Sequence, residues 1–255
     1  MPGGNMWLNL NAKLLVVLFF LGGCATYNTA TGHNEMIFVN TSQEVSMGRD
    51  LHEKLIRQER MITDGPEYDR LIRIANRLAR ISDRQDYQYH FSLIDKDELN
   101  AFTTPGGYVY VYSGLLHQLP TDDAVAAVLA HEIGHCAAKH TVKKFQAALS
   151  YDLVRNVLLS LISPEAKTVA SWTADGVMNL ATSSYGRHDE YEADRLGIKY
   201  LYLAGFDLNG MIKVFEVLET NTKGDHMPLI LRTHPFLKDR ILAAKKEIEA
   251  VKGKY

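Results

Sequence analysis

The sequence has few cysteines, little net charge and no long hydrophobic run. Its 255 residues include two cysteines, Cys24 and Cys136, too few for a disulfide framework. The 28 basic side chains nearly balance the 30 acidic ones, and no basic cluster is interleaved with aromatic residues, so no nucleic-acid partner is expected. No apolar stretch reaches the roughly 20 residues that a transmembrane helix needs. The 46% of hydrophobic residues fits one globular domain with a substantial core.

The N-terminus has the pattern of a targeting segment. A short apolar run, Leu14–Leu21, follows Lys13 and ends in L-G-G-C at Cys24. This resembles a bacterial lipoprotein signal, and Ala25 after the cysteine is similar to lipoproteins sent to the outer membrane. We therefore expect residues 1–23 to be a signal peptide and Cys24 to be acylated on the periplasmic side of the cell envelope. The alternative is an ordinary secretory signal or a short uncleaved anchor.

Residues 24–40 are rich in Thr, Asn and Gly and show no periodicity, which predicts a flexible tether. One folded domain is then expected over residues 41–255. Amphipathic helices are predicted from Thr41 to about Met61 and from Pro66 onward. Further helices are predicted over Thr141–Ile162, over Glu165–Ser184 and from Arg187.

The motif H-E-x-x-H occurs at His131, Glu132 and His135. Residues four apart lie one turn apart on a helix, so both imidazoles can point at one metal ion. Glu132 lies beside that line, where it can take a proton from a water at the metal but is poorly placed as a third ligand. Pro120, the N-cap residue Thr121 and two following aspartates favour a helix that starts here.

A hydrolytic zinc site needs a third protein ligand. In R-H-D-E-Y-E-A-D-R-L-G, Glu190 and Asp194 fall one turn apart on the apolar side of a helix, whereas Glu192 falls on the solvated side. We predict Glu190 as the third ligand, with Asp189 as the runner-up. Asp194 would accept the free N–H of a ligand histidine. The alternative is a buried salt bridge, for instance with Arg187 or Arg240.

Strand-forming residues precede the motif. Tyr108–Tyr112 favours a strand, and Pro105-Gly106-Gly107 favours a turn before it. We expect two or three antiparallel strands, with an edge strand offering backbone groups to an extended substrate. The expected substrate-binding residues are Asn100, Ala101, Phe102, Gly106 and Gly107.

Together, H-E-I-G-H and the later E-Y-E-A-D resemble the gluzincin metallopeptidases of the HtpX and CAAX-prenyl-protease type. Two further stretches, N-A-F-T-T-P-G-G-Y-V-Y-V-Y-S-G-L-L and T-H-P at His234, are similar to other motifs of that family. With its lipoprotein signal, the chain resembles the periplasmic LoiP-like and BepA-like members. The resemblance implies a mainly helical α+β, zincin-like fold with a small antiparallel sheet beside the H-E-x-x-H helix. It also implies that His234 stabilises the oxyanion or caps the metal in a latent form.

Residues 41–255 are therefore expected to be a zinc metallopeptidase domain. Its expected activity is peptide hydrolysis with one Zn²⁺ per chain, acting on unfolded or misassembled envelope proteins. Glu132 would serve as general base and then as general acid. Two rivals are a non-proteolytic or latent zinc-binding chaperone or adaptor and a zinc hydrolase of non-peptide substrates. His140 is expected to pack on another face of the metal helix. Cys136 is expected to be a small buried residue, with a thiolate ligand or redox switch as its alternative.

Overall fold

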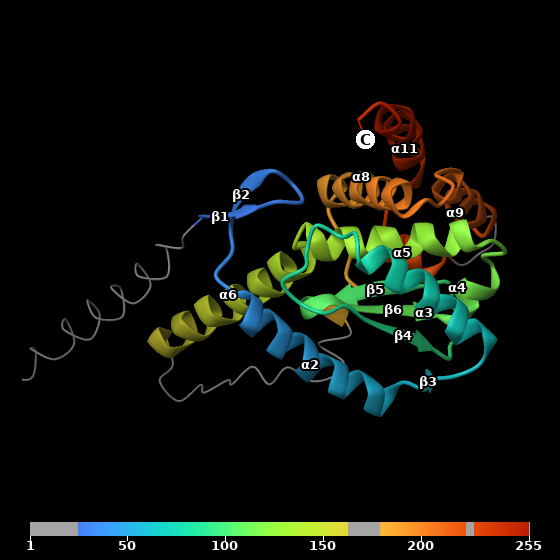
Figure 1. The fold of residues 1–255 in the computed structure, drawn as a ribbon. Coiled ribbons are helices and arrows are strands. Elements are labelled where there is room, and N and C mark those ends of the chain that lie inside the picture. Colours follow the sequence, from blue (N-terminus) through green and yellow to red (C-terminus); the bar gives the residue numbers. More distant parts are fainter. Residues whose placement is uncertain (1–24, 163–178, 223–226, 255) are drawn as a thin grey trace, which may run out of the picture.

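The structure is a computed structural model that describes residues 25–162, 179–222 and 227–254. The expected lipoprotein signal with Cys24, and most of the helix expected over Glu165–Ser184, lie outside these residues. Helices surround one four-stranded sheet, with α5 (Asp122–Ala137) above the sheet and α2 (Thr41–Gln58) below it in the view of Figure 1. The expected mainly helical α+β class is confirmed.

The four-stranded sheet is mixed, which corrects the expectation of purely antiparallel strands. Its order is β3 (Met61–Ile62), β4 (His90–Ile94), β6 (Tyr108–Tyr112), β5 (Ala101–Thr104). Strands β5 and β6 form the expected antiparallel hairpin, whose turn is a 3₁₀ segment, η1 (Pro105–Gly107). Strand β4 pairs with β6 in parallel. A parallel pairing needs a long connection, which the sequence between β4 and β6 supplies by inserting β5.

Helix α5 is the centre of the core, and its residues from Ala124 to Ala137 are all buried. Thr121 caps it as expected, accepting a hydrogen bond from the backbone N–H of Ala124 at 3.2 Å. It packs against α3 (Pro66–Ala79), α8 (Arg187–Ala204), α9 (Asn209–Thr220) and β5. A helix that is apolar on every side needs such complete cover, so this one is held by the whole fold.

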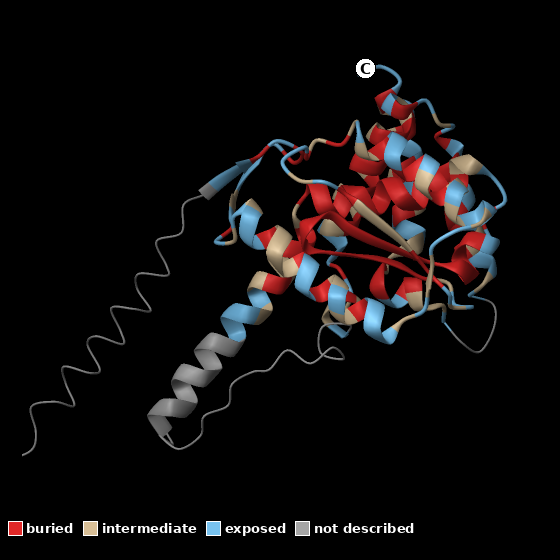
Figure 2. Ribbon diagram, turned by 60° about the horizontal axis from the view of Figure 1, so that its bottom comes forward, coloured by how far each residue is buried: buried red, intermediate tan, exposed pale blue. Residues whose placement is uncertain are grey.

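The remaining helices close the other sides. Helix α4 (Ser113–His117) follows β6, and α10 (Leu229–Thr233) and α11 (Leu237–Val251) lie near the C-terminus. Helix α6 (His140–Ile162) follows α5 after a break at Lys139, whose φ of 57° ends the first helix. Figures 1 and 2 show that α6 projects away from the rest of the fold. Among the described helices, none is both long and apolar enough to cross a membrane.

The segment expected to be a flexible tether contains a β-hairpin instead. Strands β1 (Ala25–Asn28) and β2 (His33–Met36) pair antiparallel in a separate two-stranded sheet. The Asn28 side chain donates to the carbonyl of Ala137 at the end of α5, at 3.2 Å, and Ala30 is buried in the main core. Polar composition misled the prediction because the contacts of this hairpin with the domain are mainly hydrogen bonds.

Candidate metal centre

Two tightly packed helices bring the candidate ligands together. His131, Glu132 and His135 are on α5, and Glu190 is on α8. A Cβ on Gly134 would lie 2.7 Å from the carbonyl oxygen of Ala193, so only glycine permits this approach. The helices are also close at Gly197 of α8, where a Cβ would lie 3.2 Å from the backbone nitrogen of His131. Small residues at the contact therefore set the distance between the two helices.

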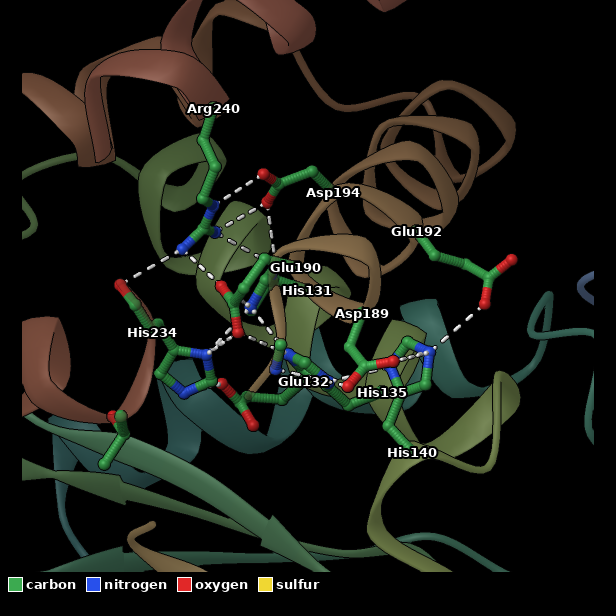
Figure 3. A network of polar contacts seen from close by, with 12 residues as sticks. His131, Glu132, His135, His140, Asp189, Glu190, Glu192, Asp194, His234 and Arg240 are labelled. Atoms are coloured by element: carbon green, nitrogen blue, oxygen red, sulfur yellow. Dashed lines mark hydrogen bonds and ion pairs between the residues drawn. The ribbon is translucent and has the colours of Figure 1, made fainter. Parts of the chain in front are cut away.

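Four side chains converge on one buried point (Figure 3). These are His131, His135, Glu190 and His234, and one potential ligand atom from each lies within 4.8 Å of the others. The Nε2 atoms of His131 and His135 are 3.0 Å apart. Glu190 oxygens lie 3.7 Å and 3.5 Å from these two nitrogens. The structure thus brings the predicted ligands together, and Asp189, the runner-up, is not in this group.

Asp194 and His140 orient the two histidines of α5. Asp194 Oδ1 lies 2.9 Å from His131 Nδ1, and a carboxylate only accepts, so we assign the His131 proton to Nδ1. His135 Nδ1 lies 3.0 Å from His140 Nδ1, while His140 Nε2 lies 3.2 Å from a carboxylate oxygen of Glu192. In neutral His140 the proton is then on Nε2, so its Nδ1 accepts a hydrogen bond from the Nδ1–H of His135. The Nε2 lone pairs of His131 and His135 therefore face each other.

Arg240 on α11 supplies the positive charge of the site. Its guanidinium contacts Glu190 and donates two hydrogen bonds of 2.7 Å to Asp194. Burial alone would raise the pKa of Glu190, but Arg240 first, and then His234 and His135, hold it well below its usual range. The pKa of Asp194 is lowered in the same way, mainly by Arg240. Both carboxylates are thus kept ionised in the core, and the salt bridge anticipated as an alternative exists beside the cluster.

His234 directly follows α10 and joins the cluster from a third segment of the chain. Its Nδ1 lies 3.0 Å from Glu190 Oε1 and 3.2 Å from His131 Nε2, and its Nε2 lies 3.4 Å from Glu132 Oε1. Burial lowers the pKa of His234, but the carboxylates of Glu190 and Glu132 outweigh this, so its pKa is raised. The imidazole can thus donate to a carboxylate or serve as a fourth ligand.

The donor set fits a zinc ion. Tetrahedral ligands at about 2.0–2.1 Å from zinc are about 3.3 Å from one another, close to the separations found here. Two lone pairs facing each other at 3.0 Å repel unless a cation lies between them. Two histidines and a carboxylate are also a ligand set that suits zinc.

Two expectations about neighbouring residues are wrong. His140 does not continue α5, because the break at Lys139 turns it back toward His135. Glu192 is not on a solvated face, because His140 draws its carboxylate inward, and only 10% of that side chain is exposed. For His140 the reason is that helical periodicity does not hold across the break at Lys139, and for Glu192 it is a contact with a residue distant in sequence. The expectation that Cys136 is buried agrees with the structure.

The expected substrate residues lie on or next to β5. Asn100, Ala101 and Phe102 are fully buried, and β5 is the edge strand of the sheet. Gly106 and Gly107 pack against α2 and Tyr87, where added side chains would meet neighbouring atoms at 3.0 Å and 2.5 Å. These two glycines therefore do not form the rim of a cleft here, since the tight turn they permit is filled by packing.

Sequence reasoning missed Tyr185. Its ring stacks on His135, with ring centroids 3.9 Å apart. On the α6 side, Lys144 Nζ lies 3.6 Å from the centroid of the Tyr185 ring. Tyr185 precedes α8 in S-S-Y-G-R, a loop sequence with no pattern that marks a site. Only the folded arrangement shows that it fixes the plane of a candidate ligand.

Comparison with known proteins identifies the family. The model of "Peptidase family M48" matches residues 67–248. The chain is 29% identical to the beta-barrel assembly-enhancing protease of Escherichia coli over 215 residues, covering 81% of this chain and 44% of that protein. It is 30% identical to the putative beta-barrel assembly-enhancing protease of Vibrio cholerae over 212 residues, covering 80% of this chain and 44% of that protein.

A mitochondrial relative matches over more of its own length. The mitochondrial metalloendopeptidase OMA1 of Saccharomyces cerevisiae is 29% identical over 255 residues, covering 90% of this chain and 72% of that protein. The chain spans less than half the length of the assembly-enhancing proteases. The family match covers most of the chain and includes the whole candidate metal centre. This chain therefore belongs to the metallopeptidase family M48.

Proposed function

We propose that this chain is a zinc-dependent metalloendopeptidase that hydrolyses peptide bonds of unfolded or misassembled cell-envelope proteins. The observation that carries the proposal is the convergence of His131, His135 and Glu190 beside the carboxylate of Glu132. A site that only stored zinc would not require a general base next to the ligands.

His131, His135 and Glu190 would hold the ion. When bound, zinc lowers the pKa of water and polarises a substrate carbonyl. Asp194 and His140 keep the two Nε2 lone pairs aimed at the metal position, and Arg240 keeps Glu190 ionised. These contacts explain how a buried, charged cluster persists inside an apolar core.

Glu132 would take a proton from the attacking water and pass it to the leaving amine. Its side chain is 1% exposed, and its Oε2 makes no hydrogen bond within the part of the chain that is described. An oxygen without a partner in the protein is free to accept a proton from a water at the metal position. This supports the proposed role of Glu132.

His234 would act either on the oxyanion or as a cap. Its Nδ1 already lies among the candidate ligand atoms, where a fourth protein ligand leaves no open position for water. We propose that this arrangement is the latent one, and that withdrawal of His234 opens the site and leaves the imidazole free to donate to the oxyanion. His234→Ala should then change turnover while zinc remains bound.

An extended substrate would lie along β5, which carries Ala101 and Phe102. The carbonyl of Asn100 pairs with the N–H of Tyr112, so alternate backbone groups of β5 face away from β6. Both amide atoms of the buried Asn100 side chain lack a hydrogen bond among the described residues. These groups would recognise a peptide backbone once the site opens.

The envelope location depends on the N-terminal signal. We propose that Cys24 is acylated and holds the protein on the periplasmic side of a membrane, most simply the outer membrane. The name of the assembly-enhancing proteases, which concerns β-barrel proteins, supports envelope proteins as substrates.

The alternative function is a latent or non-proteolytic zinc-binding chaperone or adaptor on the same fold. The observation in its favour is His234 among the ligand atoms. This alternative predicts that the chain binds its substrate without cleaving it, and that Glu132→Gln leaves substrate binding unchanged.

The test is degradation of casein, an unfolded substrate, by the chain from Ala25, with Glu132→Gln as the matched control. Zinc content is measured on both proteins. Cleavage by the unaltered chain alone, with equal zinc in both, would establish the protease and the role of Glu132. Equal zinc without cleavage, also after His234→Ala, would favour the chaperone, and absence of bound metal from both would contradict the proposal.

A further inference from the structure

On one face of the hairpin of β1 and β2, Asn28 and Glu35 contact the protein, and on the other face two large apolar side chains, Tyr27 and Met36, are exposed. In this antiparallel pair Tyr27 lies opposite Asn34, and Asn28 lies opposite His33, so Tyr27 and Asn28 point to opposite faces. Asn28 is 3% exposed and bonds to the end of α5, whereas Tyr27 is 60% exposed. Met36, on the same face as Tyr27, is 58% exposed.

The inward face is held by polar contacts. Glu35 accepts a hydrogen bond from Lys143 of α6 at 2.7 Å and another from Asn28 at 3.1 Å. After β2, Gln146 of α6 accepts from the backbone N–H of Phe38, which fixes that residue with its side chain 45% exposed. An antiparallel sheet with one solvated face normally puts its apolar side chains inside, so this hairpin is inverted.

The expected acylation of Cys24 gives a reason why apolar side chains of the hairpin face outward. Cys24, the expected acylation site, directly precedes Ala25, the first residue of β1. One residue spans at most about 3.6 Å, so an acylated Cys24 holds the hairpin at the bilayer surface with no spacer. This step rests on the lipid anchor of the proposed function.

Helix α6 lies on the same side of the molecule. Figures 1 and 2 show that it projects from the fold toward the side where the described chain begins. Its Tyr151 is 70% exposed. A membrane at the hairpin would therefore also lie near this helix.

We propose that the outer face of the hairpin (Tyr27, Met36 and Phe38) is a membrane-contacting surface that lies in the phospholipid interface and fixes the orientation of the metal centre relative to the bilayer. Tyrosine suits this depth, because its ring is apolar and its hydroxyl stays among the headgroups. Lipid is favoured over a second copy of the chain as the occupant, because the face begins one residue from the acylated cysteine.

The test uses the full acylated chain in vesicles of phosphatidylcholine with brominated acyl chains, which quench nearby tryptophan. Tyr27→Trp is compared with Leu242→Trp, a position on α11 whose residue is 70% exposed. All variants carry Trp172→Phe, since the only other tryptophan, Trp7, is in the expected signal peptide. Fluorescence at position 27 should be quenched and that at position 242 should not.

A second measurement needs no lipid anchor. For the chain from Ala25, joint replacement of Tyr27, Met36 and Phe38 by serine should lower partitioning onto vesicles of phosphatidylethanolamine and phosphatidylglycerol about tenfold. Leu242→Ser should leave it unchanged. Casein cleavage should be the same in all of these variants, because the hairpin does not reach the metal centre.

Three outcomes would overturn the proposal. They are equal quenching at the two positions, absence of acylation at Cys24, and a dimer of the chain that the triple serine replacement dissociates. Each leaves the protease test unaffected, so failure of the membrane surface is distinguishable from failure of the proposed function.

Discussion

His140 Nδ1 lies 3.0 Å from His135 Nδ1, the ring nitrogen that does not face the metal position, and so links a candidate ligand to the carboxylate of Glu192. Asp194 has the same role for the other ligand, because its Oδ1 lies 2.9 Å from His131 Nδ1. Each histidine of the H-E-x-x-H motif is therefore oriented by its own acidic residue, directly in one case and through a second imidazole in the other. Such outer contacts raise the basicity of a ligand and fix its tautomer.

This relationship predicts a loss of metal affinity when no ligand is changed. His140→Phe keeps a ring of similar size but removes the acceptor for His135, so zinc should bind about 10–100-fold more weakly. The affinity is measured by competition with a chromophoric chelator.

His117→Phe is the matched control, since His117 is a half-exposed surface histidine paired with Glu67. It should bind zinc as the unaltered chain does. Equal affinity in the two variants would mean that the contact of His140 with His135 has no part in metal binding.

Local periodicity was enough to predict the metal helix, its cap and the inward direction of Glu190 and Asp194. These depend on residues close in sequence, for which the helical repeat is a reliable guide. The parallel pairing of β4 with β6 could not be predicted, because it joins segments separated by another strand. The position of Tyr185 on His135 likewise depends on long-range packing.

The inverted hairpin shows another limit of sequence reasoning. Composition over residues 24–40 indicates a tether, but two hydrogen bonds to distant elements hold this segment in place: Asn28 donates to the carbonyl of Ala137, and Glu35 accepts from Lys143. Polar residues are ambiguous in sequence, because the same side chain can be solvated or can bond to a distant carbonyl. An alternating apolar pattern therefore does not mark strands β1 and β2 in the sequence.

Arg240 should be essential for stability when no metal is bound. Arg240→Met leaves Glu190 and Asp194 buried without their cation, at a cost of about 3–5 kcal/mol in the free energy of unfolding. Urea unfolding at pH 7 measures this cost. Arg73→Met is the control, because that ion pair with Asp122 is exposed and worth about 0.2–1 kcal/mol.

The cost of Arg240→Met should fall at low pH. In the unaltered chain the pKa values of Glu190 and Asp194 are depressed, so their contribution is present above the unfolded pKa and is lost as the pH falls through the folded one. In the variant, burial raises both pKa values, and protonation relieves the penalty as the pH falls. The difference between the two proteins should therefore begin to shrink at a pH above about 4, the ordinary value of these carboxyl groups, and should keep shrinking as the pH falls further; a constant difference would contradict this account.

Cys136 should be inert in the folded protein. Burial raises the pKa of its thiol to about 12, and its Sγ lies 2.8 Å from Thr103 Oγ1. At pH 8, four units lower, roughly one thiol in ten thousand is ionised, and only the thiolate reacts. Iodoacetamide should not modify the chain from Ala25, in which Cys136 is the sole cysteine, until urea is added. Rapid modification of the folded chain, or loss of zinc in Cys136→Ala, would restore the redox or ligand alternative.

The substitution Gly134→Ala has two opposing effects on stability, one through helix propensity and one through packing. Alanine is favoured over glycine inside a helix by about 1 kcal/mol, so propensity alone predicts a more stable protein. The new Cβ, however, would lie 2.7 Å from the carbonyl oxygen of Ala193 and 3.1 Å from its Cα, and these backbone atoms cannot rotate away. Helices α5 and α8 would have to separate, at a cost of about 1–3 kcal/mol.

The same separation should weaken zinc binding, because His131 and His135 are on one of these helices and Glu190 is on the other. Gly253→Ala is the control, since its nearest neighbour would be 3.8 Å away and surface changes of this kind stay within about 0.5 kcal/mol. Urea unfolding and chelator competition measure both effects. If Gly134→Ala stabilises the protein and retains full zinc affinity, the glycine is not what sets the distance between the ligand helices. If both quantities fall together, the geometry of the metal centre depends on a residue that has no side chain to bind the ion.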